Sequence, residues 1–135
     1  MSEKSNKIIQ QVVWDVVAWI ESDLSQKMNV TLVSARAGYS RWYFQHLFKL
    51  VTGYSLVNYI RGRRLTVAAE LLKTTNLQVT DIYLRVGFED GATFCRVFQR
   101  HFGLSPTAYR ASNSNFSSKS VLALHYQRFA NSCFK

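Results

Sequence analysis

The sequence predicts an all-α protein in which two helix-turn-helix subdomains are joined by a long connecting helix, with about seven helices in total. Three observations lead to this fold class: an internal repeat, apolar residues at helical spacing, and turn residues between the apolar runs. The repeat relates residues 38–61 to residues 87–110, with an offset of 49 at the first glycine and 50 at the other positions. Such a repeat is typical of one supersecondary unit used twice. The recurring pairs are Gly38 and Gly87, Phe44 and Phe94, Phe48 and Phe98, Gly53 and Gly103, Ser55 and Ser105, and Tyr59 and Tyr109.

Residues 5–24 are predicted to form an amphipathic helix, because apolar side chains recur at every fourth position. Valine is a poor helix former, so packing against the rest of the protein must stabilise this segment. We interpret it as a scaffold, with a partner-binding helix as the less favoured alternative. The apolar positions at this spacing are Ile8, Val12, Val16 and Ile20.

The first helix-turn-helix is predicted over residues 31–51. Thr31 is the expected N-cap of a short helix that ends at residue 37, and Gly38 supplies the turn. A second helix over residues 41–51 places its apolar residues on one face, at spacings of three and four, and Gly53 follows as its C-terminal turn. The apolar residues are Phe44, Leu47, Phe48 and Val51, and the other face carries Arg41, Trp42, Gln45, His46 and Lys49.

Ser55 is expected to cap a connecting helix over residues 56–73, and a short helix follows from about residue 80. The second copy then predicts a helix over residues 90–101, ended by Gly103, and a last short helix that starts at the cap-and-proline pair Ser105-Pro106. The connecting helix is expected to bury Tyr59, Ile60, Leu65, Ala68, Ala69 and Leu72, and the helix at 90–101 is expected to turn Phe94, Val97, Phe98 and His101 inward.

This pattern divides the chain into four parts. The first helix-turn-helix subdomain covers residues 5–54, the connecting helix residues 55–73 and the second subdomain residues 74–111. Residues 112–135 are rich in Ser and Asn at their start, and are expected to form a loop or a loose helix.

The charge of the chain points to a polyanionic partner. The sequence has 17 Lys and Arg against 8 Asp and Glu, a formal net charge of +9. Residues 24–69 contain seven basic residues and no acidic one, and a field of one sign attracts a polyanion. Double-stranded DNA is the first candidate, an anionic membrane surface the second, and a merely solubilising surface the third.

Other classes of protein find less support in the sequence. No catalytic His, Asp and Ser set, phosphate loop or metal-ligand spacing is present, so we expect neither an enzyme nor a bound cofactor or metal. Two cysteines, Cys95 and Cys133, make no disulfide framework, and no signal peptide or membrane-spanning run is evident. A reducing, cytoplasmic location fits these features. A basic membrane-surface protein and a non-specific architectural DNA-binding protein remain the alternative functions.

The exposed face of the helix at 41–51 has the groups that read DNA. A glutamine such as Gln45 pairs with the adenine edge, and Arg41 and Lys49 suit phosphates or guanine. Trp42 offers an apolar face to a thymine methyl group, and His46 is as well explained by a plain surface residue as by a reader. The further phosphate contacts that we expect are Ser40, Arg61, Arg63 and Arg64, although the three arginines also suit a solvated face.

Two recognition helices on one rigid chain have a geometric consequence. To read one face of B-DNA, their centres must lie about 34 Å apart, one helical turn. The target is then one asymmetric site of about 20 base pairs, bound by a monomer. No dimerisation segment is evident.

The motifs GYSRWYFQHLFK and YIRGRRL in the first copy, and VGFED, FCRVFQRHFG and SPTAYR in the second, resemble the DNA-binding domain of the AraC/XylS family. The resemblance covers about residues 8–111, and the tryptophan-containing helix is similar to the MarA, SoxS and Rob branch. It implies an activator of stress and multidrug-resistance promoters that contacts RNA polymerase. Without a sensor domain, the resemblance implies control by abundance and no small-molecule effector.

The resemblance also assigns the readers. In the first helix they fall on Trp42, Gln45 and His46, where the branch usually has arginine at the last position. In the second they fall on Gly91, Ala92, Cys95 and Arg96, where the branch commonly has two glutamines and then a threonine. Side chains at Gly91 and Ala92 donate no hydrogen bond, so we predict that the second unit reads fewer bases and relies on Arg96, Arg100 and backbone amides. Tyr83 lies where the family favours alanine, which predicts looser packing there.

Overall fold

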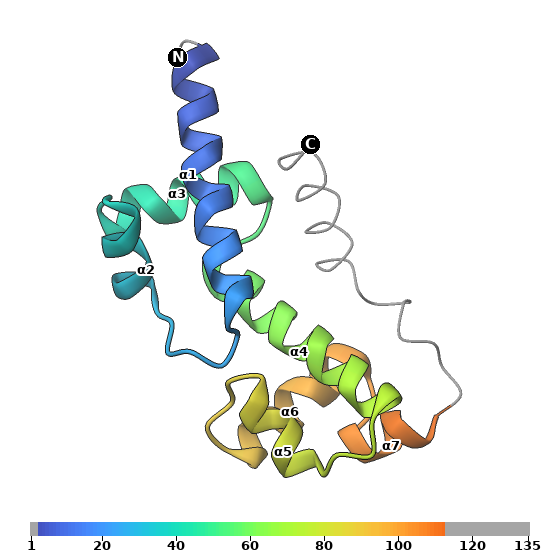
Figure 1. Ribbon diagram of the computed structural model, residues 1–135. Helices are drawn as coiled ribbons and strands as arrows, with labels where there is room; N and C mark the ends of the chain where they lie inside the picture. The colour runs from blue at the N-terminus through green and yellow to red at the C-terminus, as the bar shows by residue number, and fades with distance from the viewer. Residues whose placement is uncertain (1–2, 113–135) are drawn as a thin grey trace.

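Every element in the described part of the chain is an α-helix, which confirms the predicted fold class. The computed structural model describes residues 3–112, and the expected tail lies outside this range from residue 113 onward. Figure 1 shows α1 to α3 as one cluster, α5 to α7 as a second, and α4 running from the first to the second. The seven helices of this range are α1 (Glu3–Ser22), α2 (Val30–Ala37), α3 (Arg41–Thr52), α4 (Leu56–Thr74), α5 (Val79–Arg85), α6 (Gly91–Phe102) and α7 (Pro106–Ala111).

The helix starts follow side-chain caps, and one predicted cap is wrong. Asn29, and not Thr31, caps α2: its backbone is extended and its Oδ1 accepts a hydrogen bond of 2.8 Å from the Leu32 N–H. Thr31 therefore lies inside the first turn, since a side chain caps only from the residue before the helix. The predicted caps Ser55 and Ser105 are confirmed, each accepting from the N–H three residues later at 3.2 Å.

The first core lies between α1, α2, α3 and the start of α4. The C-terminal half of α1 is buried there, whereas Figure 1 shows its N-terminal turns projecting beyond the cluster. Burying an aliphatic or aromatic side chain stabilises by about 1.5–3 kcal/mol, so α1 is a main support of α3. The buried side chains include Val13, Val17 and Ile20 from α1, Phe44, Leu47 and Phe48 from α3, and Leu56, Tyr59 and Ile60 from α4.

The second core lies between the rest of α4 and helices α5, α6 and α7. Its centre is a run of aromatic rings at fourth positions of α6: the centroids of Phe94 and Phe98 lie 5.5 Å apart, and those of Phe98 and Phe102 lie 4.6 Å apart. Tyr109 of α7 closes the run, 5.4 Å from Phe98. The prediction that His101 points inward is wrong, because Phe102 continues the i+4 series and leaves His101 exposed.

Helix α4 belongs to both cores. Its first half packs in the first core and its second half in the second, so one continuous helix fixes the two clusters to each other. All six side chains predicted to be buried on it are buried. No helix in residues 3–112 has the length and apolar character that crossing a bilayer requires.

Candidate nucleic-acid interface

Helix α3 presents a polar and aromatic face to solvent. Its apolar side holds Phe44, Leu47 and Phe48 in the core, which turns the opposite residues outward. Trp42 is 75% exposed, an unusual state for so large an apolar side chain, and this confirms the prediction that it lies at the surface. The other four predicted residues of this helix, Arg41, Gln45, His46 and Lys49, are exposed as well.

The exposed side chains of α3 form one continuous surface. The rings of Trp42 and His46 are stacked one helical turn apart, with centroids 5.9 Å apart and planes at 4°. Together with Gln45, Lys49 and Leu50 they line a shallow hollow. Leu50, 70% exposed, was not predicted as a site residue, although a leucine among the polar positions of the helix was a usable signal. The surface offers an amide, a flat apolar patch and a charge, which is the chemistry of base-edge readout.

Ser40 stabilises the start of α3. Its Oγ accepts a hydrogen bond of 3.2 Å from the Tyr43 N–H, so the side chain satisfies one of the unpaired donors of the first turn. Its hydroxyl proton is left for an acceptor outside the helix, and a contact with phosphate stays a prediction.

Helix α6 is built in the same way but has a sparser surface. Ala92, Arg96 and Arg100 are exposed and Gly91 is half-buried. Cys95 is also half-buried and packs against the second core, which places part of this predicted reader among apolar neighbours. The arginines are therefore the longest reaching groups of this predicted set.

Asp90 gives α6 a charged cap. Its Oδ1 accepts from the Thr93 N–H at 2.7 Å and its Oδ2 from the Thr93 hydroxyl at 2.9 Å. These two hydrogen bonds lower the pKa of Asp90, and the charge of Arg96 lowers it further. The start of α6 thus carries a negative charge beside Arg96, whereas the cap of α3 is neutral.

Arg61 of α4 and Arg100 of α6 border the same hollow. This depression lies between the α3–α4 corner and α6, and His101 lines it too. Both arginines are exposed, so two cations from separate helices lie beside one concave surface. Such a pair suits contact with a phosphate of a DNA backbone that runs between the two recognition helices.

Arg63 and Arg64 are engaged inside the protein by Glu21 and by two backbone carbonyls, so their contact with phosphate stays a prediction with less support than that of the exposed Arg61. Arg63 donates to both carboxylate oxygens of Glu21, at 2.6 and 3.1 Å, and each side chain of the pair is only 12% exposed. Arg64 donates to the carbonyl oxygens of Leu24 and Gln26, both at 2.9 Å. Burial lowers the pKa of Arg64, which the Glu89 charge partly opposes. Sequence spacing alone does not show which arginine of a cluster finds an internal partner.

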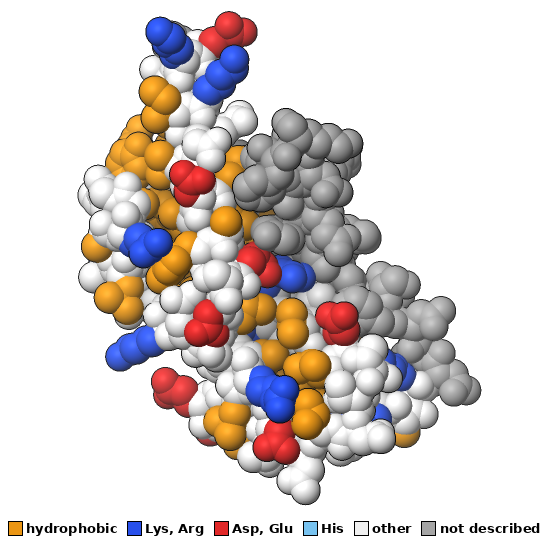
Figure 2. All heavy atoms as spheres, viewed as in Figure 1, with side chains coloured by type: hydrophobic (Ala, Val, Ile, Leu, Met, Phe, Trp, Pro, Cys, Tyr) orange, Lys and Arg blue, Asp and Glu red, His pale blue; other side chains and the backbone are white. Residues whose placement is uncertain are grey.

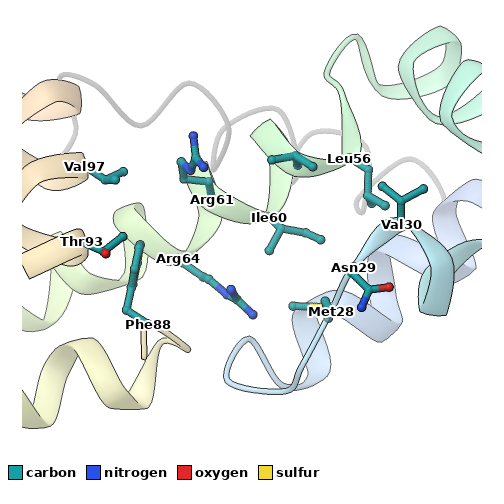
Figure 3. Close-up of a pocket in the computed structure, with 11 residues that line it drawn as sticks. Met28, Asn29, Val30, Leu56, Ile60, Arg61, Arg64, Phe88, Thr93 and Val97 are labelled. Atoms are coloured by element: carbon teal, nitrogen blue, oxygen red, sulfur yellow. The ribbon is translucent and has the colours of Figure 1, made fainter. Parts of the chain in front are cut away.

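A cleft of about 190 Å³ separates the two clusters along α4 (Figure 3). Met28 and Val30 lie on its first side, Phe88 and Val97 on its second, and Arg64 points between them. Gly87 also approaches the first subdomain closely: a Cβ at this position would lie 2.6 Å from the Leu24 carbonyl oxygen and 2.8 Å from the Arg64 Nε. The joint between the subdomains is therefore made by backbone as well as by side chains.

The basic residues of 24–69 differ in their exposure to solvent. Five of the seven are exposed, namely Lys27, Arg36, Arg41, Lys49 and Arg61. On the face seen in Figure 2, which looks onto α1, acidic side chains lie among the basic ones. In residues 3–112 no group of three His, Cys, Asp or Glu side chains lies close enough to hold a metal ion.

Comparison with known proteins identifies relatives of the whole arrangement. A family model described as a helix-turn-helix domain matches residues 33–112. The regulatory protein SoxS of Escherichia coli strain K12 is 42% identical over 101 residues, which is 75% of this chain and 94% of SoxS. The transcriptional activator AarP of Providencia stuartii is 34% identical over 116 residues, 86% of each chain.

The fold has solved counterparts. The DNA-binding domain of AdpA, a global transcriptional factor whose crystal structure contains a target DNA, aligns with a TM-score of 0.71 and 33% identity. The alignment covers 73% of this chain and 89% of the AdpA chain. The resemblance found in the motifs is thereby confirmed. With its duplicated helix-turn-helix and these relatives, the chain belongs to the AraC-type family of DNA-binding transcription regulators, which are not enzymes, in the branch of SoxS and AarP.

Proposed function

We propose that this protein is a sequence-specific activator that binds, as a monomer, one asymmetric DNA site of about 20 base pairs, with α3 and α6 in successive major grooves. The observation that carries the proposal is the pair of capped, aromatic-backed helices fixed to one continuous α4. Covalent duplication supplies two reading units in one chain, so the protein needs no partner subunit to span two grooves.

In this proposal α3 is the main reader. Gln45 pairs with an adenine edge, while the stacked Trp42 and His46 rings lie against base edges and thymine methyl groups. Arg41, Lys49 and Ser40 contact phosphates on either side. Leu50 extends the apolar part of the same contact.

In this proposal helix α6 contacts fewer bases than α3, and more of its contacts position the protein on the DNA backbone. Arg96 is the proposed base contact, because it is exposed and long enough to reach guanine. Gly91, Ala92 and Cys95 contribute close approach of the backbone instead of hydrogen-bonding side chains. Arg61 and Arg100, which border one hollow, hold the phosphate between the two half-sites.

The regulatory outcome is proposed from the relatives. AarP is a transcriptional activator, and the branch resemblance implies contact with RNA polymerase at stress and multidrug-resistance promoters. Control by abundance, with no small-molecule effector, belongs to the same proposal, as does a place on the bacterial nucleoid.

Systematic base substitution in a target promoter tests the proposal. The full chain is footprinted on the promoter, and its affinity for each substituted site is compared with random DNA at one stated salt concentration. We expect one protein per site, protection of about 20 base pairs, and stronger base discrimination in the half-site under α3. Gln45→Ala should lose discrimination at one position, and Gln10→Ala, an exposed change on α1, is the matched control.

The alternatives predict different results. Equal affinity for promoter and random DNA would indicate an architectural DNA-binding protein. Co-sedimentation with anionic vesicles together with no DNA preference would indicate a membrane-surface protein. A two-to-one complex on the site would refute the monomer.

A further inference from the structure

At two equivalent positions, the two copies of the repeat place a small and a large side chain in opposite order. In the first copy, α2 has the small and buried Ser34, and α3 opens with the long side chain of Arg41. In the second copy, the equivalent residue of α5 is Tyr83, and α6 opens with Gly91, which has no side chain. In the second copy, a large residue on the preceding helix thus accompanies the absence of a side chain at the first position of the recognition helix.

The space next to Gly91 is occupied by Tyr83. A Cβ built at Gly91 would lie 3.3 Å from the Tyr83 Cε2, 3.6 Å from its Cζ and 3.7 Å from its hydroxyl oxygen. Gly91 does not have a positive φ, unlike the four glycines at the turns and helix ends of the described chain. The glycine is therefore explained by the room that the tyrosine takes, and not by backbone conformation.

The ring of Tyr83 is held in place, and not loosely packed as its position in the sequence led us to expect. It stacks on Phe94, with centroids 5.9 Å apart and planes at 27°, and Phe94 is fully buried in the second core. Tyr83 itself is half-buried, so its apolar ring is packed while its polar end lies at the first turn of α6. A fixed phenol loses little conformational entropy when it binds.

We propose that Tyr83 is a DNA-contacting residue that replaces the missing side chain at the start of α6, its hydroxyl donating a hydrogen bond to a backbone phosphate. A phosphate is the expected acceptor because the first helix of a helix-turn-helix crosses the DNA backbone, and tyrosine is among the residues that bind there. In this arrangement the start of α6 makes no side-chain contact with a base, and Tyr83 contacts the DNA backbone instead. This inference rests on the proposed function, since it requires α6 to enter the major groove.

The test is Tyr83→Phe, which removes the hydroxyl and keeps the ring. We expect binding of the specific promoter to weaken by about 3- to 10-fold, equally for every base variant of the second half-site, with unchanged stability in urea. Replacing the contacted phosphate by an uncharged methylphosphonate should abolish the difference between wild type and variant. The salt dependence should not change, because the phenol carries no charge.

A double-mutant cycle tests the size exchange. Gly91→Ala should weaken binding or stability in the wild type and be neutral in a Tyr83→Ala background, whereas Ala92→Ser should be additive with Tyr83→Ala. Specific binding by Tyr83→Phe with wild-type affinity would overturn the inference and leave the proposed function intact. A change in base preference at one position would overturn the phosphate assignment. Absence of sequence preference in the wild type would instead defeat the proposed function itself.

Discussion

The two helix-turn-helix units share a core and differ in surface. Both use a glycine turn of positive φ, an N-cap that accepts from the third residue of the recognition helix, and phenylalanines at fourth positions. In the first unit a neutral Ser40 precedes a surface with five polar or aromatic candidates, and in the second a charged Asp90 precedes Gly91 and Ala92. Packing constrains the buried positions of a repeat, whereas its exposed positions diverge freely, so asymmetry of the surface is expected to become asymmetry of the DNA site.

The units also differ in how they are supported. The first unit packs on the 20-residue α1, and the second is closed by the six-residue α7. Their turn glycines also differ in their surroundings. Nothing lies within 4 Å of a Cβ built at Gly38, but Gly87 is packed against Leu24 and Arg64. The turn of the second unit thus also forms the joint between subdomains.

The largest effect is expected for Gly87→Ala compared with Gly38→Ala. The two have similar φ values, +97° and +83°, but only Gly87 combines the backbone strain with a clash of 2.6 Å against a carbonyl. We expect Gly87→Ala to reduce the free energy of unfolding by about 3–5 kcal/mol and Gly38→Ala by about 1–2 kcal/mol, measured in urea. Equal losses would show that the joint adds nothing to the cost of the turn.

Arg63→Ala is expected to have the next largest effect, and to act on stability. The change leaves the largely covered Glu21 carboxylate, 12% exposed, without its ion-pair partner, so the free energy of unfolding should fall by about 3 kcal/mol. Arg61→Ala, on the exposed side of the same helix, is the matched control and should unfold like the wild type. Unchanged stability of Arg63→Ala, with weaker DNA binding, would instead support its predicted contact with phosphate.

Base discrimination distinguishes the two recognition helices. Gln45→Ala and Arg96→Ala should each lose about 1–3 kcal/mol of discrimination at one base position, in opposite half-sites. Summed over each half-site of the wild type, discrimination should be greater under α3, because α6 has fewer side chains that donate hydrogen bonds. Affinity measurements on the substituted promoter series give both quantities. If the two half-sites discriminate equally, the comparison between the helices is wrong.

Arg61→Ala is expected to weaken binding without changing its base preference. Losing one phosphate contact should reduce the slope of log affinity against log salt by about 0.9. Lys7→Ala removes a charge from the projecting end of α1 and should leave the slope nearly unchanged. Titrations at several salt concentrations measure this, and an identical slope for Arg61→Ala would place the phosphate elsewhere.

The smallest effect is a difference in acid sensitivity of the two caps. The folded protein lowers the pKa of Asp90, so its ionised form stabilises α6 above the ordinary carboxyl pKa and this contribution is lost as the pH falls through the lowered value. Ser40 does not titrate there. Asp90→Asn retains a cap and should flatten the loss of stability below about pH 4. Hydrogen bonds from Ser25 lower the pKa of Asp23 as well, although Asp23 caps neither recognition helix. Asp23→Asn is therefore the variant with which the acid sensitivity of Asp90→Asn is compared.

Much of the fold followed from local pattern, and the errors share a cause. The exposure of Trp42 follows from helical periodicity, and the capping of α4 follows from a serine before an apolar run. Thr31 was wrong as a cap because Asn29, two residues earlier, competes for the same role. His101 was wrong as an inward residue because Phe102 fills that place better in the assembled core. Local patterns specify that a helix has a buried side, but neighbouring elements decide its edges.

By itself, the sequence determined the class of the protein: two copies of one helical unit, a basic stretch at residues 24–69 without acidic residues, and the motifs of a DNA-binding family. Only the tertiary structure decided which arginines remain for a partner, since Arg63 and Arg64 find acceptors some 40 residues away along the chain. It also showed that Tyr83 takes the space beside Gly91. The physical reason is that periodicity and turn chemistry are local, whereas partners for buried charge and space for side chains depend on which segments meet when the chain is folded.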